Sequence, residues 1–364
     1  MSDAPYRRSA WPERARWTLG RLAALAVAGA VALATAPHAP AAELLCEGED
    51  LIARLAETDP AAHAALLAEA EAVENGGRRL WRIEPEAGGA PSHLFGTYHD
   101  TEADDTLTPA VDAAFETAER LVVELTTAEV ARMEKRARTD PGFVMRPEPL
   151  DGVDTLSERL SPEERVAAEA VLAERGLNLA VAERLRPWML FSTLGVPACQ
   201  MRALAAGESV LDQVLVERAE ARGLPVTGLE TYEAALGAFD ALDDEATRRL
   251  AVDALLLAAI EEDVRATLLG AYAEGEVGLL AAFGDRLART RTAQTSEEGA
   301  RLAEAFAERL LVGRNRAWMD PLEAALADGG AFVAVGALHL PGEDGLVALL
   351  RERGYAVEPV AEGF

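Results

Sequence analysis

Residues 331–339 read AFVAVGALH, an apolar run that ends in a Gly-x-x-His motif. A continuous apolar run of this length, bounded by turn signals, is typical of a strand buried on both faces of a sheet. A turn and helix pattern, PGEDGLVALLRERG (341–354), follows it, and then a last strand, YAVEPV (355–360). The C-terminal end of the chain therefore predicts a unit of strand, Gly-x-x-His, helix and strand.

A matching unit lies near the other end of the chain. Residues 92–99, SHLFGTYH, predict a strand that ends in a second Gly-x-x-His motif, and a helix pattern at 108–119 and the apolar strand RLVVEL (120–125) follow it. The alternating stretch LWRIE (80–84) and the turn residues PEAGGAP predict a hairpin with the first strand. A weak internal duplication of this kind indicates one sheet that is assembled from both ends of the chain.

Helical patterns fill most of the chain between the two units. The clearest helix start is SPEE (161–164), with Ser as N-cap, Pro at the first helical position and Glu at the capping-box position. One strand, LPVTGLE (224–230), interrupts the helices, and no low-complexity linker divides the chain. We therefore predict a single α/β domain over residues 42–364: a central mixed β-sheet built from N- and C-terminal β-GxxH-α-β units, with a large helical insertion at about 127–328.

The two motif histidines, His99 and His339, each lie just past the carboxyl end of a predicted strand. Ligands of α/β sheets bind at this edge, and the preceding glycine permits a tight or unusual backbone angle. A single Gly-x-x-His is a weak motif, and each histidine alone is more simply a satisfied residue at a strand end. Because two of the five histidines of the chain occupy matching positions, we predict that they act as a pair.

Two carboxylates lie near the ends of predicted strands, Glu124 in RLVVEL and Glu230 in LPVTGLE. A buried carboxylate is costly unless it is paired or bound to a metal, so the alternatives are an exposed strand end or a salt bridge. Two imidazoles and one or two carboxylates suit a borderline divalent ion rather than Ca²⁺. We predict a metal site with His99, His339 and Glu124 as ligands, where the ion activates water and a spare glutamate acts as general base.

Arg314 and Asn315 lie on a predicted helix that leads into the C-terminal histidine strand. An arginine at this place is a candidate for binding an oxyanion or a substrate carboxylate. An ion pair with Asp or Glu is the other interpretation, and it is the more common fate of an arginine in an acidic chain.

Composition and the N-terminus indicate an exported, globular protein. Half of the 364 residues are hydrophobic, and the formal net charge of −27 disfavours nucleic acid and anionic lipid as partners. Residues 1–41 predict a signal peptide, with arginines before an apolar run at 22–36 that is too short to span a bilayer, and an Ala-x-Ala site at 39–41. We therefore expect a periplasmic or secreted protein with no stable membrane span after cleavage; the Arg7-Arg8 pair leaves the twin-arginine export route open.

Cys46 and Cys199 are the two cysteines of the chain. In an oxidising compartment an even pair is most simply a disulfide, and the long loop that it would close would stabilise the fold by roughly 4–5 kcal/mol in the chain-entropy model. Two unpaired buried thiols are the alternative.

The sequence resembles the TraB/PrgY/GumN family, whose animal relatives are the TIKI metalloproteases. The stretches that carry the resemblance cover essentially the whole mature chain: LWRIE…HLFGTYHD, RLVVEL, GESVLDQVL, LPVTGLET, RNRAWMDPLEAAL and FVAVGALHLPGEDGLVALLRERGYAVEPV. The resemblance implies a disulfide between the two cysteines. It implies a site that contains His99, His339, Glu124, Glu230, Arg314 and Asn315, and Asp212 also fits the pattern. Ala235 departs from it, since the family usually has Gln there.

The TIKI branch resembles Mn²⁺- or Co²⁺-dependent peptidases, so the resemblance implies a metal-dependent hydrolase that acts on a peptide or protein substrate. The ion is Mn, Co or Zn, and the sequence does not choose among them. The alternative is a non-catalytic metal-, haem- or peptide-binding protein on the same scaffold. Tyr98, next to His99, keeps haem in consideration because Tyr and His both ligate haem iron. Neither the substrate nor the oligomeric state follows from the sequence.

Overall fold

The computed structural model describes residues 46–85, 89–145, 155–240, 244–291, 304–305 and 307–363. The predicted signal peptide lies outside the described residues. In the described part of the chain, no helix is both long enough and apolar enough to span a bilayer.

The centre of the described structure is a six-stranded mixed sheet with the order β4-β3-β5-β2-β1-β6. Its strands are β1 (Leu80–Glu84), β2 (Ser92–Thr97), β3 (Arg120–Val123), β4 (Val226–Gly228), β5 (Ala331–Gly336) and β6 (Ala356–Pro359). Strand β1 is antiparallel to β2 and β6, and the pairs β2–β5, β5–β3 and β3–β4 are parallel. The predicted hairpin, the mixed sheet and its assembly from both ends of the chain are confirmed.

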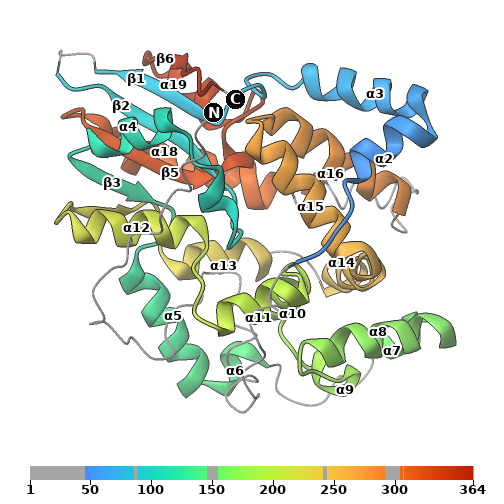
Figure 1. Ribbon diagram of the computed structural model, residues 1–364. Helices are drawn as coiled ribbons and strands as arrows, with labels where there is room; N and C mark the ends of the chain where they lie inside the picture. The colour runs from blue at the N-terminus through green and yellow to red at the C-terminus, as the bar shows by residue number, and fades with distance from the viewer. Residues whose placement is uncertain are drawn as a thin grey trace, which may run out of the picture.

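Helices make up most of the rest, and Figure 1 shows the helices from the middle of the chain gathered away from the sheet. In chain order they are α2 (Leu51–Thr58), α3 (Pro60–Glu71), α4 (Pro109–Glu116), α5 (Thr127–Thr139), α6 (Pro141–Val144), α7 (Leu156–Arg159), α8 (Pro162–Glu174), α9 (Leu179–Ala182), α10 (Pro187–Leu194), α11 (Ala198–Ala205), α12 (Leu211–Ala221), α13 (Tyr232–Asp240), α14 (Asp244–Leu257), α15 (Glu261–Ala273), α16 (Val277–Arg291), α18 (Gly313–Leu326) and α19 (Leu346–Glu352). Short 3-10 or π turns are η2 (Ala103–Thr106), η3 (Ala258–Ile260), η5 (Glu308–Val312) and η6 (Ala337–His339). Helix α8 begins with the predicted capping box between Ser161 and Glu164.

The two faces of the sheet pack into different hydrophobic cores. On β5, Phe332 and Ala334 belong to a core with α4, α12, α15 and α16, whereas Val333 and Val335 belong to a core with α18 and α19. This alternation follows from the two-residue period of a strand. Both faces are covered, which explains why β5 is apolar throughout.

The connections between the strands create a switch point at the carboxyl ends of β2 and β5. Strands β2 and β5 are neighbours, and Thr97 pairs with Gly336 at their carboxyl ends. From β2 the chain runs through α4 to β3, which lies on the far side of β5. From β5 the chain runs the other way, through α19 to β6, which lies beyond β1. The chain therefore leaves these two strands in opposite directions and over opposite faces. In open α/β sheets a ligand crevice forms at such a switch point, outside the carboxyl ends of the strands.

Neither motif glycine, at the ends of β2 and β5, is needed for backbone freedom, and Gly96 is needed for space. Neither Gly96 nor Gly336 has a positive φ, and the φ of Gly336 is −51°. A β-carbon on Gly96 would lie 2.8 Å from the Cα of Ala337, which is closer than backbone atoms allow. The predicted reason for these glycines, an unusual backbone angle, is therefore wrong; Gly96 lets the turn after β5 pack directly on β2.

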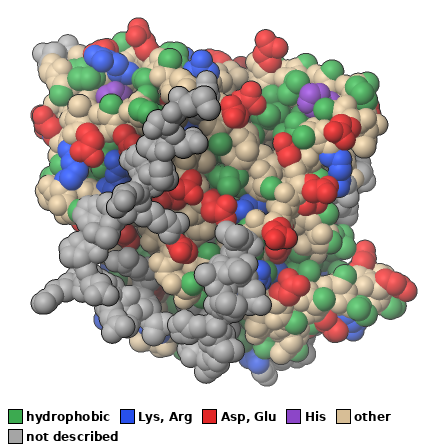
Figure 2. Space-filling view, in the orientation of Figure 1, with side chains coloured by type: hydrophobic (Ala, Val, Ile, Leu, Met, Phe, Trp, Pro, Cys, Tyr) green, Lys and Arg blue, Asp and Glu red, His purple; other side chains and the backbone are tan. Residues whose placement is uncertain are grey.

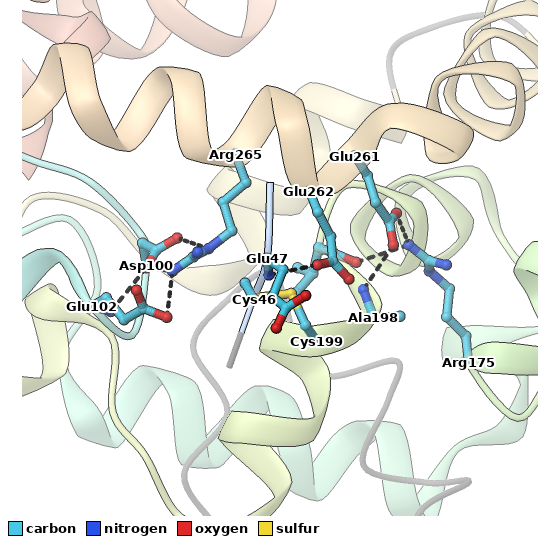
Figure 3. The surroundings of a disulfide bond; sticks show 11 residues. Cys46, Glu47, Asp100, Glu102, Arg175, Ala198, Cys199, Glu261, Glu262 and Arg265 are labelled. Carbon is cyan, nitrogen blue, oxygen red and sulfur yellow. Dashed lines mark hydrogen bonds and ion pairs between the residues drawn. A yellow bond between two sulfur atoms is a disulfide. The ribbon is translucent and has the colours of Figure 1, made fainter. Parts of the chain in front are cut away.

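The disulfide Cys46–Cys199 joins the start of the described chain to α11, with a Cα–Cα distance of 5.3 Å. The prediction of a disulfide is confirmed. Figure 3 shows it beside the first turn of α15, whose carboxylates accept hydrogen bonds from both linked segments. The Glu47 amide donates to Glu262 at 2.8 Å, and the Ala198 amide donates to Glu261 at 3.0 Å.

Candidate functional site

Three side chains from three neighbouring strand ends surround one point at the switch between β2 and β5. A β-carbon built on Gly336 would lie 3.3 Å from Glu124 Oε1, 3.5 Å from His339 Cδ2 and 3.6 Å from His99 Nε2. His99 follows β2, Glu124 follows β3, and His339 ends the turn after β5. The structure thus brings the two motif histidines together, although 240 positions separate them along the chain.

The ring of His99 is held from behind by Asp212. Nδ1 of His99 lies 2.6 Å from Oδ2 of Asp212, in the first turn of α12, and the hydroxyl of Thr97 donates to Oδ1 of the same carboxylate at 2.6 Å. A carboxylate accepts a hydrogen bond, so Nδ1 carries the proton and Nε2 is directed toward Gly336. Asp212 therefore fixes both the orientation and the tautomer of His99.

The ring of His339 is held in the same manner by Asn315. Nδ1 of His339 lies 2.6 Å from Oδ1 of Asn315, whose Nδ2 donates to the carbonyls of His339 at 3.2 Å and Asp344 at 2.9 Å. Because its Nδ2 is used by the two carbonyls, Asn315 offers Oδ1 to the ring, and Nδ1 is the protonated nitrogen. Nε2 of His339 lies 3.3 Å from Nη1 of Arg314 and 3.8 Å from Oε1 of Glu124.

Arg314 joins the two predicted carboxylates. It donates to Glu124 Oε2 at 2.6 Å and to Glu230 Oε1 through Nε at 3.0 Å. Glu124 also accepts the backbone N–H of Gly336 at 2.7 Å. Arg314 therefore forms an ion pair, which is the second of the two interpretations that the sequence left open.

These contacts set the charges of the site. Burial acts to raise the pKa of Glu124, but Arg314 and the two histidines outweigh it and lower that pKa to about 2. Burial lowers the pKa of His339 to about 4, so this ring is neutral at pH 7. Burial also acts against the charged form of His99, but the charge of Asp212 and its hydrogen bond raise the pKa of His99 to about 9. Burial raises the pKa of Glu230, against the effect of Arg314.

The site opens into a cavity of about 810 Å³. His99, Glu124, Asp212, Arg314 and His339 line it, whereas Glu230 and Asn315 do not. The structure thus places Glu230 behind Arg314 and Asn315 behind His339, as residues that hold their neighbours in position. Of the predicted general bases, only Glu124 reaches the cavity.

Two supporting groups were not predicted, Thr97 and the pair Asp100–Arg265. Arg265, on α15, donates to both carboxylate oxygens of Asp100 at 2.7 Å, and this pair anchors the chain next to His99. Asp100 directly follows the Gly-x-x-His motif, which was a usable sequence signal. Nothing near Arg265 in the sequence indicated its role.

The imidazole and carboxylate groups of the site are ligands that a divalent ion prefers, but too few of those in the described part of the chain are placed to hold one. Nε2 of His99 and the Cδ2 edge of His339 converge beside Glu124, and each ring is oriented through Nδ1 by an oxygen acceptor, as metal-binding histidines are. Yet among the described residues no three His, Cys, Asp or Glu side chains are placed to hold a metal ion. Arg314 accounts for the difference, since it binds Oε2 of Glu124 and contacts Nε2 of His339. Because Arg314 binds Oε2, Glu124 has only Oε1 to offer as a third ligand.

Replacing Asp212 with Asn should lower the pKa of His99 in the metal-free protein from about 9 toward its ordinary value of 6.5. The substitution keeps the shape of the side chain but removes the charge that stabilises the imidazolium. The measurement is an NMR titration of the histidine ring protons in the presence of a chelator. His339, held by an uncharged amide, should keep its low pKa in the variant; an unchanged His99 titration would contradict the assigned ion pair.

The fold and site together define a doubly wound α/β protein with a polar His–Glu–Arg centre at its switch point. A family model, the TraB/PrgY/gumN family, matches residues 79–359, and the chain belongs to that family. The matched region runs from the residue before β1 to the end of β6, so it contains the whole sheet and every residue of the centre. No curated protein and no solved structure matches the chain significantly.

Proposed function

We propose that this chain is an exported, metal-dependent hydrolase that cleaves peptide bonds at the His99–His339 centre. The observation that carries the proposal is the convergence of two histidine rings beside Glu124: Nε2 of His99 and Cδ2 of His339 lie next to the same point, Nε2 of His339 is 3.8 Å from Oε1 of Glu124, and each Nδ1 is fixed by its own acceptor. A satisfied structural histidine needs only one such partner. Two histidine rings that converge in the wall of a cavity, each held by its own partner, form an arrangement suited to binding.

In this proposal His99, His339 and Glu124 hold a divalent ion, with Mn, Co and Zn as the candidates. When bound, such an ion supplies Lewis acidity for a carbonyl and makes water more acidic. Asp212 and Asn315 keep the imidazoles in the tautomer that offers Nε2. Arg314 keeps Glu124 ionised, since its guanidinium stabilises the negative charge, and Glu230 holds Arg314 in place.

The second candidate is a non-catalytic metal-, haem- or peptide-binding protein. The ion pair between Arg314 and Glu124 favours haem or peptide binding, because neither needs Glu124 as a metal ligand. Tyr98 lines the cavity beside His99, and it would be the residue to hold a haem iron there, with its ring packed 5.5 Å from that of Tyr272. Metal uptake without cleavage of any peptide, or a Soret band on addition of haem, would favour this second function.

Export is part of the proposal. It rests on the signal-like residues 1–41 and on the disulfide, since disulfides persist mainly in oxidising compartments. Figure 2 shows acidic side chains spread over much of the described surface on one face, consistent with a net charge of −27. A surface of this charge repels nucleic acid, so a peptide is the more suitable substrate.

Replacing Gly336 with Ala tests the proposal without removing any donor. The new methyl group would lie 3.3–3.6 Å from Glu124 Oε1, His339 Cδ2 and His99 Nε2, in the space where the donors meet. We expect metal content to fall and peptide cleavage to drop by roughly tenfold or more, as for other changes beside metal ligands. The measurements are elemental analysis after dialysis against Mn²⁺, Co²⁺ or Zn²⁺, and cleavage of a peptide library by the same samples.

Gly237→Ala is the matched control, because a β-carbon at Gly237 meets nothing within 4 Å. The Gly336 variant keeps the N–H that Glu124 accepts, and its backbone angles (φ −51°, ψ 135°) are open to alanine, so thermal unfolding should change little. Wild-type metal content and cleavage in the Gly336 variant would contradict the proposed site. If the wild type itself takes up no metal, the metal-dependent function is lost.

A further inference from the structure

The cavity extends well beyond the His–Glu–Arg centre, and its wall there is mostly apolar. Helices α5, α10, α11 and α12 contribute to this part of the wall. Its apolar side chains include Val130, Met133, Leu194, Leu204, Val210 and Val216. A volume of about 810 Å³ lies in the range of pockets that enclose a ligand of several residues or a comparable organic molecule.

The charged groups that line this cavity already have partners within the protein. Of the described residues, the arginines in the wall are Arg265 and Arg314; Arg265 binds Asp100 through two hydrogen bonds, and Arg314 binds Glu124 and Glu230. A ligand carboxylate would have to compete with an internal carboxylate for either guanidinium. The cavity therefore favours an uncharged ligand over a fatty acid or another apolar anion.

Two glutamines in the cavity wall carry the uncharged polar groups that an uncharged ligand needs as hydrogen-bond partners. Gln200, on α11, is only 3% exposed and Gln213, on α12, is partly buried; both line the cavity. Gln200 Nε2 and Gln213 Oε1 are both buried, and neither has a hydrogen-bond partner among the described residues. A buried donor or acceptor without a partner is costly, and such an exception in a folded protein calls for an explanation.

We infer that Gln200 and Gln213 determine specificity, and that they bind the amide groups of an uncharged, apolar peptide segment held in the cavity. Gln200 donates its Nε2–H to a peptide carbonyl, and Gln213 accepts a peptide N–H at Oε1. The last torsion of a glutamine side chain is soft, so rotation about it turns either amide toward the ligand. The inference rests on the proposed function for the bond that is cut, but binding itself needs no cleavage.

The chemistry of an amide fits this pair better than that of other apolar ligands. One orphan atom is a donor and the other is an acceptor, and a peptide group carries the complement of both. An ester offers a carbonyl but no N–H, and an acyl chain offers neither. The neighbouring residues connect the pair to the site, because Gln213 follows Asp212 directly in the first turn of α12.

Calorimetric titration of the chelator-treated protein tests the inference in the absence of cleavage. The probes are the capped peptide acetyl-Leu-Ala-Leu-Ala-amide, the analogues in which each internal amide is replaced in turn by an ester, and laurate. We expect the peptide to bind roughly tenfold more tightly than at least one ester analogue, the change that one unpaired buried group produces. Laurate should bind more weakly than the peptide.

The variants Gln200→Met and Gln213→Met keep the length of the side chain and remove its amide. Gln213→Met should bind the peptide and the ester analogues within about twofold of each other, because the acceptor for the peptide N–H is gone. Gln200→Met should bind the peptide and the esters both roughly tenfold more weakly than the wild type does, because it loses the donor to a carbonyl that amide and ester share. Met201→Leu, next to Gln200 but outside the cavity wall, should keep the wild-type preference. If Gln200→Met does not fold, Gln213→Met and the ester series on the wild type still decide the question.

The outcomes separate this inference from the proposed function. Equal binding of peptide and esters by the wild type, tighter binding of laurate, or no binding of the peptide at all would overturn the inference. So would a preference for the amide that survives Gln213→Met, or wild-type peptide affinity in Gln200→Met. Preferential peptide binding without any cleavage by the metal-loaded protein would leave the inference standing and refute only the hydrolase.

Discussion

Alanine in place of His339 should lower peptide cleavage by at least about 100-fold and remove most of the bound metal, the largest loss that we expect from any single substitution. His339 contributes one of the two rings that converge beside Glu124, with its Nε2 3.8 Å from Oε1 of Glu124, and its ring is buried against Trp318 at a centroid distance of 4.4 Å. Loss of the ring leaves His99 with no second imidazole and leaves Oδ1 of Asn315 without its partner. Elemental analysis and cleavage of a peptide library by the same preparation measure both effects.

His93→Ala is the matched control for this experiment. His93 is also on β2, but it lies near the other end of the strand, pairs in register with Phe332 and does not line the cavity. The control variant should keep metal and activity. The substitution of His339 also opens a cavity in a buried region, so thermal unfolding must be compared in both variants. A folded His339 variant with full metal content would refute the assignment of this ring as a ligand.

The sheet was predictable from the sequence because its strands have strong local patterns. The apolar run of β5, the alternation in β1 and the two Gly-x-x-His motifs are visible without knowledge of any contact. The placing of β2 beside β5 then followed from the duplication and from the general behaviour of parallel strands. The helical region was predictable in type only, since periodicity finds helices but does not say how they pack.

The candidate site was predictable in its residues but not in its internal pairing. His99, His339 and Glu124 could be named because each follows a buried strand. The pairing of Arg314 with both glutamates depends on contacts across 190 and 84 positions, and no local pattern carries such information. For the same reason the sequence could not distinguish Glu124, which reaches the cavity, from Glu230, which lies behind Arg314.

The cavity and its glutamines were not foreseen at all. Apolar residues of α5, α11 and α12 have the spacing of ordinary core residues, and only the packing of these helices leaves space between them. The unpartnered atoms of Gln200 and Gln213 are likewise a property of the packed structure. A sequence pattern predicts which face of a helix is buried, but it does not predict whether that face meets protein or a ligand.

The double substitution Cys46→Ser/Cys199→Ser should reduce the free energy of unfolding by about 4 kcal/mol, because the disulfide closes a long loop. The two cysteines are 153 positions apart, so the unfolded chain gains a large number of conformations when the link is absent. Urea unfolding of the oxidised wild type, the reduced wild type and the double variant measures the effect. The reduced wild type and the double variant should agree, since both lack the bond.

The same substitution should loosen the surroundings of His99 before the rest of the protein unfolds. The first turn of α15 accepts hydrogen bonds from both segments that the disulfide joins, through Glu261 and Glu262, and one turn further on Arg265 binds Asp100 (Figure 3). Without the disulfide, the segment at Glu47 is held to α15 by hydrogen bonds from three backbone N–H groups: Glu47 donates to Glu262, Glu49 to Asp263 and Leu51 to the hydroxyl of Thr267.

Hydrogen exchange in native buffer should therefore be at least about tenfold faster in α15 and at residues 98–106, in line with local opening of a less stable unit. Strands β2 and β5, with their two buried faces, should keep their protection and serve as the internal control. If hydrogen exchange instead became uniformly faster over the whole sheet, the disulfide would stabilise the protein only by restricting the unfolded chain. In that case α15 does not transmit the constraint from the disulfide to His99.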